Sequence, residues 1–394
     1  MSNYPINQQD RNLIRILHVV GGMDPGGVET WLMHILRNID RDRFHMDFIV
    51  HTKKHCAYDD EICTIGSKII PCLHPNQPWT YAANFRRIVN EHGPYDIVHS
   101  HVHHFSGYVL RLAKQLGIRT CIAHSHNDTS TVEDIAPWYR RWYLSLTKRW
   151  ISNYASVGLG CSHKAAANLF GVDWQSDPRW QILYYGINLN PLRDRIDPVA
   201  MRSELGIPSD AFVIGHVGRF AEQKNHLFLL EIAATVVELE PLTRLLLVGD
   251  GSLRPVIEDK IQQMGLTPYV ILAGLRSDVP QLMQSVMDVF LLPSFHEGLP
   301  IVGIEAQAAG IPLVLSDVIT EELDRVKPLI KRLSLSQGAS EWAKAVLESH
   351  SLKSFYLQAE SLKSIENSPF NIEISVKQLE NIYQAQVTKE SVFV

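Results

Sequence analysis

Several features of common protein classes are absent from this sequence. No apolar run reaches the roughly 18 residues that a membrane-spanning helix needs. The first twelve residues are polar and lack the apolar stretch of a secretory signal. The five cysteines are odd in number and form no CxxC pair, which disfavours a disulfide framework or a cysteine metal site. Tandem repeats and low-complexity tracts are also missing, so we expect a globular, cytoplasmic protein.

The chain is long enough for two domains. Its 394 residues exceed one ordinary core, and 45% hydrophobic with 20% charged residues is a globular composition. A polar, proline-bearing stretch at 188–198 is the predicted linker. We therefore predict an N-terminal domain over 1–188 and a second domain over 189–370. The segment 371–394 is predicted to contain a helix that packs back on the first domain, since its apolar residues recur near helical spacing.

Short apolar runs alternate with amphipathic stretches in both halves. Alternation of this kind predicts parallel sheets with helices on both faces, that is, two doubly wound, Rossmann-like α/β domains. In the first half we predict a helix over 28–38 and strands at 15–20, 45–51, 69–72, 96–99 and 120–123. In the second half we predict strands at 212–217, 243–248, 269–273, 288–292 and 312–315, with helices at 226–238, 252–264, 278–286 and 300–309.

The loops after the second-half strands carry glycines together with charged residues. Ligands of open parallel sheets bind beyond the carboxyl ends of the strands, which is where these loops lie. Arg219 and Lys224 follow the first of these strands, five residues apart, and could converge on a diphosphate. Positive charge fixed there would stabilise a departing nucleotide diphosphate. The alternative is two solvated surface charges.

A second constellation is EGLPIVGIE, in which Glu297 and Glu305 are eight residues apart. Pro300 suits the first helical position, so Glu297 is predicted in the loop before the helix and Glu305 inside it. The amides of Gly298 and Leu299 would then point at a ligand at the positive helix end. A buried carboxylate at Glu305 could grip a vicinal diol; the alternative is a solvent-facing side chain.

These residues carry a resemblance to a known family. The segments GRFAEQKNH, LLLVGDGSLR, LAGLRSDV and PSFHEGLPIVGIEAQAAGIPLVLSD resemble the donor domain of the family 4 retaining glycosyltransferases, including their E-x7-E element. In the first half, GGMDPGGVETWLMHILRNI, DIVHSHVHH and AHSHN fit as well. The resemblance implies a GT-B fold, two Rossmann-like domains facing across a cleft. The branch is similar to bacterial exopolysaccharide transferases.

The resemblance also implies roles for particular residues. Arg219 and Lys224 would hold the donor diphosphate, Glu305 the ribose, and Glu297 the transferred sugar. The remaining donor-binding positions that it implies are Gly26, Gly27, Gly249, Arg276, Gly298, Leu299 and Pro300. The catalytic set is then Glu297, His126, Arg219 and Lys224.

Histidines end two first-half strands, and the resemblance places one near the sugar and acceptor. His126 is preferred over His124 for this position, with His99, His101 and His124 as acceptor-side candidates. Structural or solvated histidines are the alternative for His99 and His101.

The segment 138–154 is basic and aromatic. On a helix it places Tyr139, Trp142, Tyr143, Leu146 and Trp150 toward one face and Arg140, Arg141, Lys148 and Arg149 toward the other. Residues 1–190 carry 19 Lys and Arg against 16 Asp and Glu, and the rest 18 against 26. The segment therefore predicts either peripheral contact with the inner face of a membrane or a core-packed helix with a solvated basic face.

The resulting expectation is a retaining glycosyltransferase that uses no metal or other cofactor. Its partners would be a nucleotide-sugar, most simply UDP-linked, and a saccharide or lipid-linked acceptor, with no nucleic acid. Two other classes remain open: another nucleotide-sugar enzyme such as an epimerase or phosphorylase, and a non-catalytic nucleotide-sugar-binding protein.

Overall fold

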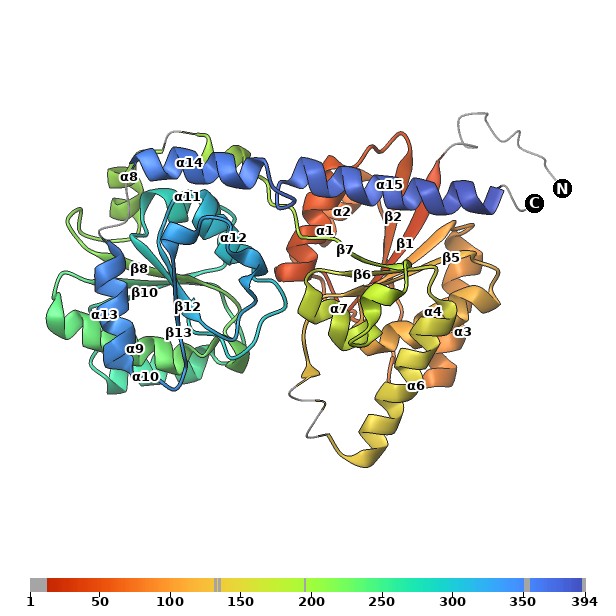
Figure 1. Cartoon of the computed structure of the whole chain (residues 1–394), viewed down its shortest axis with the longest axis horizontal. Coiled ribbons are helices and arrows are strands. Elements are labelled where there is room, and N and C mark those ends of the chain that lie inside the picture. The colour runs from red at the N-terminus through yellow and green to blue at the C-terminus, as the bar shows by residue number, and fades with distance from the viewer. Residues whose placement is uncertain (1–12, 131–132, 134–135, 195, 351–354, 392–394) are drawn as a thin grey trace. The chain divides into compact units, whose positions relative to one another are not determined.

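The computed structural model describes residues 13–130, 133, 136–194, 196–350 and 355–391 (Figure 1). These residues form two compact units. Unit 1 comprises Met1–Gly186 together with Ile372–Val394, and unit 2 comprises Ile187–Asn371. The chain thus leaves unit 1 once and returns to it through its last helix.

Unit 1 is built on a parallel seven-stranded sheet with the order β3-β2-β1-β4-β5-β6-β7. Its strands are β1 (Ile14–Val20), β2 (Phe44–Val50), β3 (Ile69–Pro71), β4 (Ile97–Ser100), β5 (Thr120–Ser125), β6 (Val157–Gly160) and β7 (Trp180–Ile182). Its α-helices are α1 (Gly27–Asn38), α2 (Asp59–Ile65), α3 (Pro78–His92), α4 (Ser106–Gln115), α6 (Trp138–Tyr154), α7 (His163–Phe170) and α15 (Ile372–Ser391). The order is the doubly wound one, in which the direction of winding reverses between β1 and β4.

Unit 2 repeats this plan with a parallel six-stranded sheet of order β10-β9-β8-β11-β12-β13. Its strands are β8 (Val213–Val217), β9 (Arg244–Val248), β10 (Val270–Gly274), β11 (Val289–Leu292), β12 (Leu313–Ser316) and β13 (Ile330–Leu333). Its α-helices are α8 (Pro198–Glu204), α9 (His226–Leu239), α10 (Arg254–Gln263), α11 (Val279–Ser285), α12 (Ile301–Ala308), α13 (Ala339–His350) and α14 (Phe355–Glu366). The winding reverses between β8 and β11.

Helix α15 belongs to unit 1 although it is the last helix of the chain (Figure 1). Its buried Tyr383 donates or accepts a hydrogen bond at 2.8 Å with His99 Nδ1 of β4. Glu380 accepts a bond from the backbone amide of Asp40, and Ser375 donates one to the carbonyl of Tyr184. These contacts anchor the helix to three separate parts of unit 1.

The predicted strands all occur, with ends that shift by one or two residues. Three further strands, β6, β7 and β13, were not predicted. β6 is the glycine-rich VGLG, a composition that disfavours strands by intrinsic propensity. A Cβ added at Gly158 would lie 2.3 Å from the ring of Trp180 on β7, so close packing requires the glycine that weakens the sequence signal.

Helix α6 departs from its predicted orientation. Its buried residues are Leu144, Thr147 and Ile151, and it packs on α4. The aromatic residues at its amino end are not buried: Trp138 is 81% exposed and Trp142 66% exposed. The aromatic face is therefore exposed at its amino end and packed on α4 further along, where Trp150 contacts Tyr108 and Arg111. Among the described residues, no helix is long and apolar enough to cross a bilayer.

Candidate active site

Two loops meet at the point where the winding of unit 2 reverses. β8 and β11 are neighbours in the sheet, and the loops that follow them are joined by hydrogen bonds. Asn225 Nδ2 donates to the carbonyl of Pro293 at 3.1 Å, and the amide of Phe295 donates to the carbonyl of Gln223 at 2.9 Å. Asn225 itself has a φ of 55°, a left-handed conformation that asparagine tolerates better than most residues. Residues some 70 positions apart are thereby held together.

The consequence is a partly buried ion pair between two of the predicted catalytic residues. Lys224 Nζ donates to Glu297 Oε1 at 2.6 Å, and the side chains are 15% and 8% exposed. Gln223 Nε2 donates to the other carboxylate oxygen of Glu297 at 3.1 Å and to the carbonyl of His296. The Glu297 carboxylate is therefore fixed from two sides. Gln223 was not predicted as a site residue, since no charge marks it in the sequence.

Gly249 lies where the loops after β8 and β9 touch. Its φ is 138°, and an added Cβ would lie 2.0 Å from the carbonyl oxygen of Gly218. Only glycine fits this position without moving the backbone. Gly249 thus brings the β9 loop against the start of the loop that carries Arg219 and Lys224.

Arg219 is exposed, and the described part of the chain offers its side chain no hydrogen bond or ion pair. It differs in this from Lys224, which is held by Glu297. The loop thus carries two cations of different kinds. The guanidinium of Arg219 can move to an incoming anion, whereas the ammonium of Lys224 is already positioned by Glu297.

The loop after β11 leads directly into α12. Gly298, Leu299 and Pro300 are buried, and Pro300 occupies the N-cap rather than the predicted first helical position, because the helix begins at Ile301. Pro300 makes no side-chain capping bond, and the amide of Gly303 donates to its carbonyl at 3.0 Å, so within the described residues the amides of Ile301 and Val302 remain for a ligand. Although α12 begins one residue later than predicted, the loop with Glu297 still lies directly before the amino end of the helix, as predicted.

Glu305 lies in the second turn of α12 and has no hydrogen-bond partner among the described residues. Burial raises the pKa of its carboxyl group from 4.5 to about 7. The side chain is partly accessible, and its contact with a ribose remains a prediction beside the solvent-facing alternative. A buried, unpaired carboxyl group is costly unless a ligand completes its hydrogen bonds.

Arg276 is engaged within unit 2. Its guanidinium donates twice to Asp278, at 2.8 and 2.7 Å, and once to Glu204 at 2.9 Å. These carboxylates raise the pKa of Arg276 further above its ordinary value. The Arg276 side chain is therefore committed to contacts within the protein. A contact between this loop and the base of a nucleotide would have to come from the loop backbone.

In unit 1 the predicted catalytic and acceptor-side histidines belong to two chains of hydrogen bonds. Tyr383, His99 and His124 form the first, with 3.2 Å between His99 Nε2 and His124 Nδ1. The second runs from His18 through His101 and His126 to the hydroxyl of Tyr185, with 2.9 Å at each of the two histidine contacts. Three members of these chains were not predicted: His18 on β1, Tyr185 after β7 and Tyr383 on α15.

These histidines are deeply buried, which lowers the pKa of all five imidazoles. Burial lowers the pKa of His18 and of His126 to about 3. The rings are therefore neutral near pH 7. Both nitrogens of His126 are bonded, and His124 Nε2 is buried without a partner in the described chain, so neither ring offers an exposed nitrogen.

Gly26 and Gly27 begin α1. Gly26 is the N-cap, with extended backbone, and Gly27 is exposed. A Cβ added at Gly27 would meet nothing within 4 Å. The packing of unit 1 does not require a glycine at position 27, and the helix start is open to a ligand.

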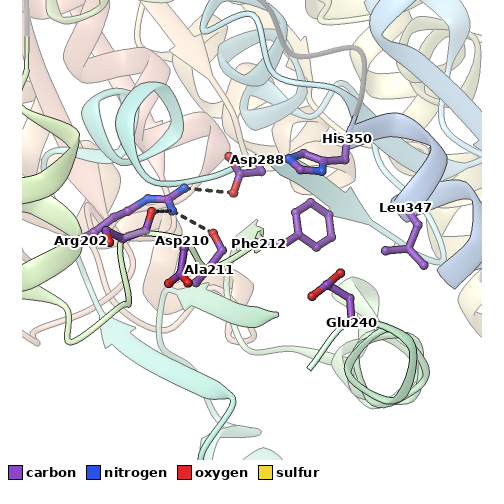
Figure 2. Close-up of a pocket in the computed structure, with 9 residues that line it drawn as sticks. Arg202, Asp210, Ala211, Phe212, Glu240, Asp288, Leu347 and His350 are labelled. Carbon is purple, nitrogen blue, oxygen red and sulfur yellow. Dashed lines mark hydrogen bonds and ion pairs between the residues drawn. The ribbon is translucent and has the colours of Figure 1, made fainter. Parts of the chain in front are cut away.

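A cavity of about 340 Å³ lies elsewhere in unit 2 (Figure 2). It is lined by Phe212 and Asp288, which precede β8 and β11, and by Arg202, which bonds to Asp288 at 3.0 Å and to the carbonyl of Ala211. Its wall thus lies at the amino ends of the strands, opposite to the loops with Lys224 and Glu297. Ligands of such sheets bind at the carboxyl ends, so we do not place the donor in this cavity.

Comparison with known proteins agrees with this architecture. Residues 25–190 match the model of Glycosyltransferase Family 4, and residues 211–350 match that of Glycosyl transferases group 1. The putative glycosyltransferase EpsF of Bacillus subtilis is 36% identical over 84% of this chain and 86% of its own length. The chain is a family 4 glycosyltransferase with the GT-B fold.

Two further relatives bear on the donor. The Escherichia coli UDP-Gal:alpha-D-GlcNAc-diphosphoundecaprenol alpha-1,3-galactosyltransferase is 30% identical over 57% of this chain and 58% of its own length. The crystal structure of Anabaena HepE with UDP-glucose covers 94% of this chain and 100% of that one, with a TM-score of 0.76 at 19% identity. At this identity the structural likeness concerns the fold alone.

Proposed function

We propose that this glycosyltransferase transfers a hexosyl group from a UDP-sugar, with retention of configuration, to a saccharide or lipid-linked acceptor in polysaccharide synthesis. The observation that carries the proposal is the meeting of Lys224 and Glu297 at the winding reversal of unit 2. A cation for a leaving phosphate and a carboxylate for a sugar lie 2.6 Å apart there. The names of the E. coli and Anabaena relatives, which contain UDP-Gal and UDP-glucose, support the choice of UDP.

In this proposal each residue acts on one part of the donor. Arg219, Lys224 and the amino end of α12 bear the charge that grows on the diphosphate as the glycosidic bond breaks, and they do so without a divalent cation. Glu305 accepts hydrogen bonds from the ribose hydroxyls, and Glu297 contacts the sugar. Retention follows from attack of the acceptor on the face that the phosphate leaves, with a departing phosphate oxygen taking the acceptor proton.

The proposal predicts that uridine nucleotides stabilise the protein. UDP at about 100 times its dissociation constant should raise the free energy of unfolding by about 2.7 kcal/mol. Thermal denaturation with UDP, GDP and ADP at equal concentration measures this, and transfer from the matching nucleotide-sugar is then assayed with added glycan and lipid-linked acceptors. Stabilisation by GDP or ADP but not UDP would contradict the donor, and isomerisation of the sugar without transfer would contradict the reaction.

We also propose that the amino end of α6 contacts an anionic membrane that carries the acceptor. Trp138 and Trp142 are exposed beside Arg140 and Arg141, a combination typical of interfacial helices. Lys148 was predicted to be part of this basic surface, but its ammonium group donates to Glu133 Oε2 at 3.0 Å and is therefore less available to a lipid headgroup. The three cations that remain are Arg140, Arg141 and Arg149.

The membrane proposal predicts salt-sensitive binding to vesicles that contain anionic lipid. Each cation near such a surface contributes about 1 kcal/mol, so replacing Arg140, Arg141 and Arg149 by serine should weaken binding about 100-fold. Sedimentation at low and high salt measures it. The matched control replaces Arg86 and Arg87, two exposed cations on α3 of the same unit. Wild-type protein that stays in the supernatant at low salt would rule the contact out.

A further inference from the structure

Three of the buried histidines of unit 1 converge from neighbouring strands. His101 follows β4, His124 is the last residue but one of β5, and His126 comes just after that strand. One nitrogen from each ring lies within 4.8 Å of the corresponding nitrogens of the other two. We propose that His101, His124 and His126 bind a divalent transition-metal ion of the zinc class.

The hydrogen bonds around the trio suit three metal ligands. A neutral imidazole has one N–H donor and one lone pair, and a ligating histidine generally donates its N–H to a second group. Each ring of the trio has such a group outside it. His101 Nε2 lies 2.9 Å from His18 Nδ1, His124 Nδ1 lies 3.2 Å from His99 Nε2, and His126 Nδ1 contacts the hydroxyl of Tyr185.

The remaining nitrogens are those that would face the ion. Without an ion, His101 Nδ1 and His126 Nε2 share a hydrogen bond at 2.9 Å. The third nitrogen, His124 Nε2, is buried and has no partner among the described residues. With all three protons directed outward, a cation takes the place of the shared proton between the first two nitrogens and supplies a partner to the third. Three neutral rings can thus bind it without releasing a proton.

Two other groups of possible ligands fit less well. In the set of His18, His99 and His101, both nitrogens of His99 already contact groups outside the set, Tyr383 and His124. In the set of His103, His104 and Glu133, the carboxylate already accepts hydrogen bonds from Lys148 and from Asn168. A metal ion there would have to displace a salt bridge.

The ligand chemistry selects the class of ion. Imidazole favours zinc, copper and nickel over magnesium or calcium, which prefer oxygen. Three protein ligands leave a fourth position for water or another oxygen donor. The sequence analysis predicts no metal and treats these histidines as catalytic, acceptor-side or structural residues; β4 and β5 bring them together in the fold. The site belongs to unit 1, whereas Arg219 and Lys224 belong to unit 2, and the ion would link the ends of β4 and β5.

Metal binding to the full-length chain tests the proposal without any assay of activity. Protein freed of metal with a chelator is titrated with Co²⁺ and followed by its visible absorption, and with Zn²⁺ and followed by thermal denaturation and metal analysis. We expect one ion per chain, the absorption bands of histidine-bound Co²⁺, and a melting temperature that rises with Zn²⁺ concentration. Wild-type protein that shows neither the bands nor the stabilisation would overturn the proposal.

Variants assign the binding to the trio. His124→Ala should abolish the Co²⁺ bands, and His18→Gln, which removes the group behind His101, should weaken the affinity about 10- to 100-fold. His51→Gln is the control, since His51 follows β2 in the same unit and bonds to Tyr81 at 3.0 Å. Wild-type affinity in His124→Ala, or equal loss in His51→Gln, would show that the ion binds elsewhere. The wild-type titration decides the matter even if a variant does not fold.

Discussion

Replacing Arg219 by alanine is expected to lower kcat by about 100- to 1000-fold while leaving the melting temperature unchanged. The side chain is exposed and has no partner in the described chain, so folding does not depend on it. Loss of one donor to a developing negative charge costs about 2.7–4 kcal/mol of transition-state stabilisation. The measurement is turnover at saturating nucleotide-sugar and acceptor. Lys331→Ala, which removes an exposed cation from β13 of the same unit, is the control.

Lys224→Ala should lower kcat by a similar factor, and it should also destabilise the protein. Removing Lys224 leaves the Glu297 carboxylate without its ion-pair partner at a partly buried position, so the variant should melt at a lower temperature than the wild type. The double variant Lys224→Ala with Glu297→Gln should recover part of that stability but none of the turnover. Normal turnover in either single cation variant would mean that the diphosphate does not bind at this loop.

Glu305→Ala is expected to weaken UDP binding about 10- to 100-fold. The carboxyl group has no partner within the described ranges of the chain, and a hydrogen bond to a charged group contributes about 1.5–3 kcal/mol. Calorimetry with UDP measures the loss. Gln307→Ala is unsuitable as a control because Gln307 bonds to the carbonyls of Gly303 and Leu323. Glu258→Ala, on α10 and bonded to Arg254 Nε at 2.8 Å, is the matched substitution.

The same residue predicts a pH dependence. Burial raises the pKa of Glu305 to about 7, so the ionised form that accepts ribose hydroxyls best becomes dominant above that pH. UDP affinity relative to Glu305→Gln should therefore rise about tenfold between about pH 6 and about pH 8. The comparison cancels the titration of the phosphate, which both proteins share. A constant ratio would mean that Glu305 does not contact the nucleotide.

The raised pKa of Glu305 affects stability in the opposite direction to UDP affinity: its contribution to the free energy of unfolding falls as the pH rises. The folded-state pKa of Glu305 is raised from 4.5 to about 7, so the folded protein favours the neutral carboxyl group. That contribution to the free energy of unfolding is complete below about pH 4.5 and is lost as the pH rises through about 7. Bound UDP should reduce the loss, since it stabilises the ionised form.

Much of the fold and of unit 2 could be predicted from the sequence. The strands that precede the loops at Arg219, Gly249 and Glu297 are apolar runs flanked by turn residues. Hydrophobicity and the positions of the turn residues are therefore enough to locate these strands. Carboxyl-end loops of a parallel sheet share one edge, which groups these residues before any coordinates exist. The short strands β6, β7 and β13 were missed because three or four residues carry too little pattern, and β6 contains glycines that its packing demands.

The histidines show where local pattern fails. His99, His101, His124 and His126 were found as polar residues at strand ends, but their partners His18, Tyr185 and Tyr383 lie on β1, on the segment after β7 and on α15. A side chain from residue 383 against one from residue 99 is a product of tertiary packing. The preference for His126 as the residue facing the sugar remains a prediction, since both its nitrogens are bonded within unit 1.

By itself, the sequence determined the class of protein, the two doubly wound units and the loops that carry charge, because hydrophobic period, glycine position and motif spacing are local properties. Only the tertiary structure decided which side chains pair. It placed Lys224 on Glu297, left the side chains of Glu305 and Arg219 without a partner among the residues that the structure describes, exposed the aromatic end of α6 and gathered five histidines in one core. Pairing depends on sheet order and on the crossing of helices, and residues distant along the chain meet only when those are formed.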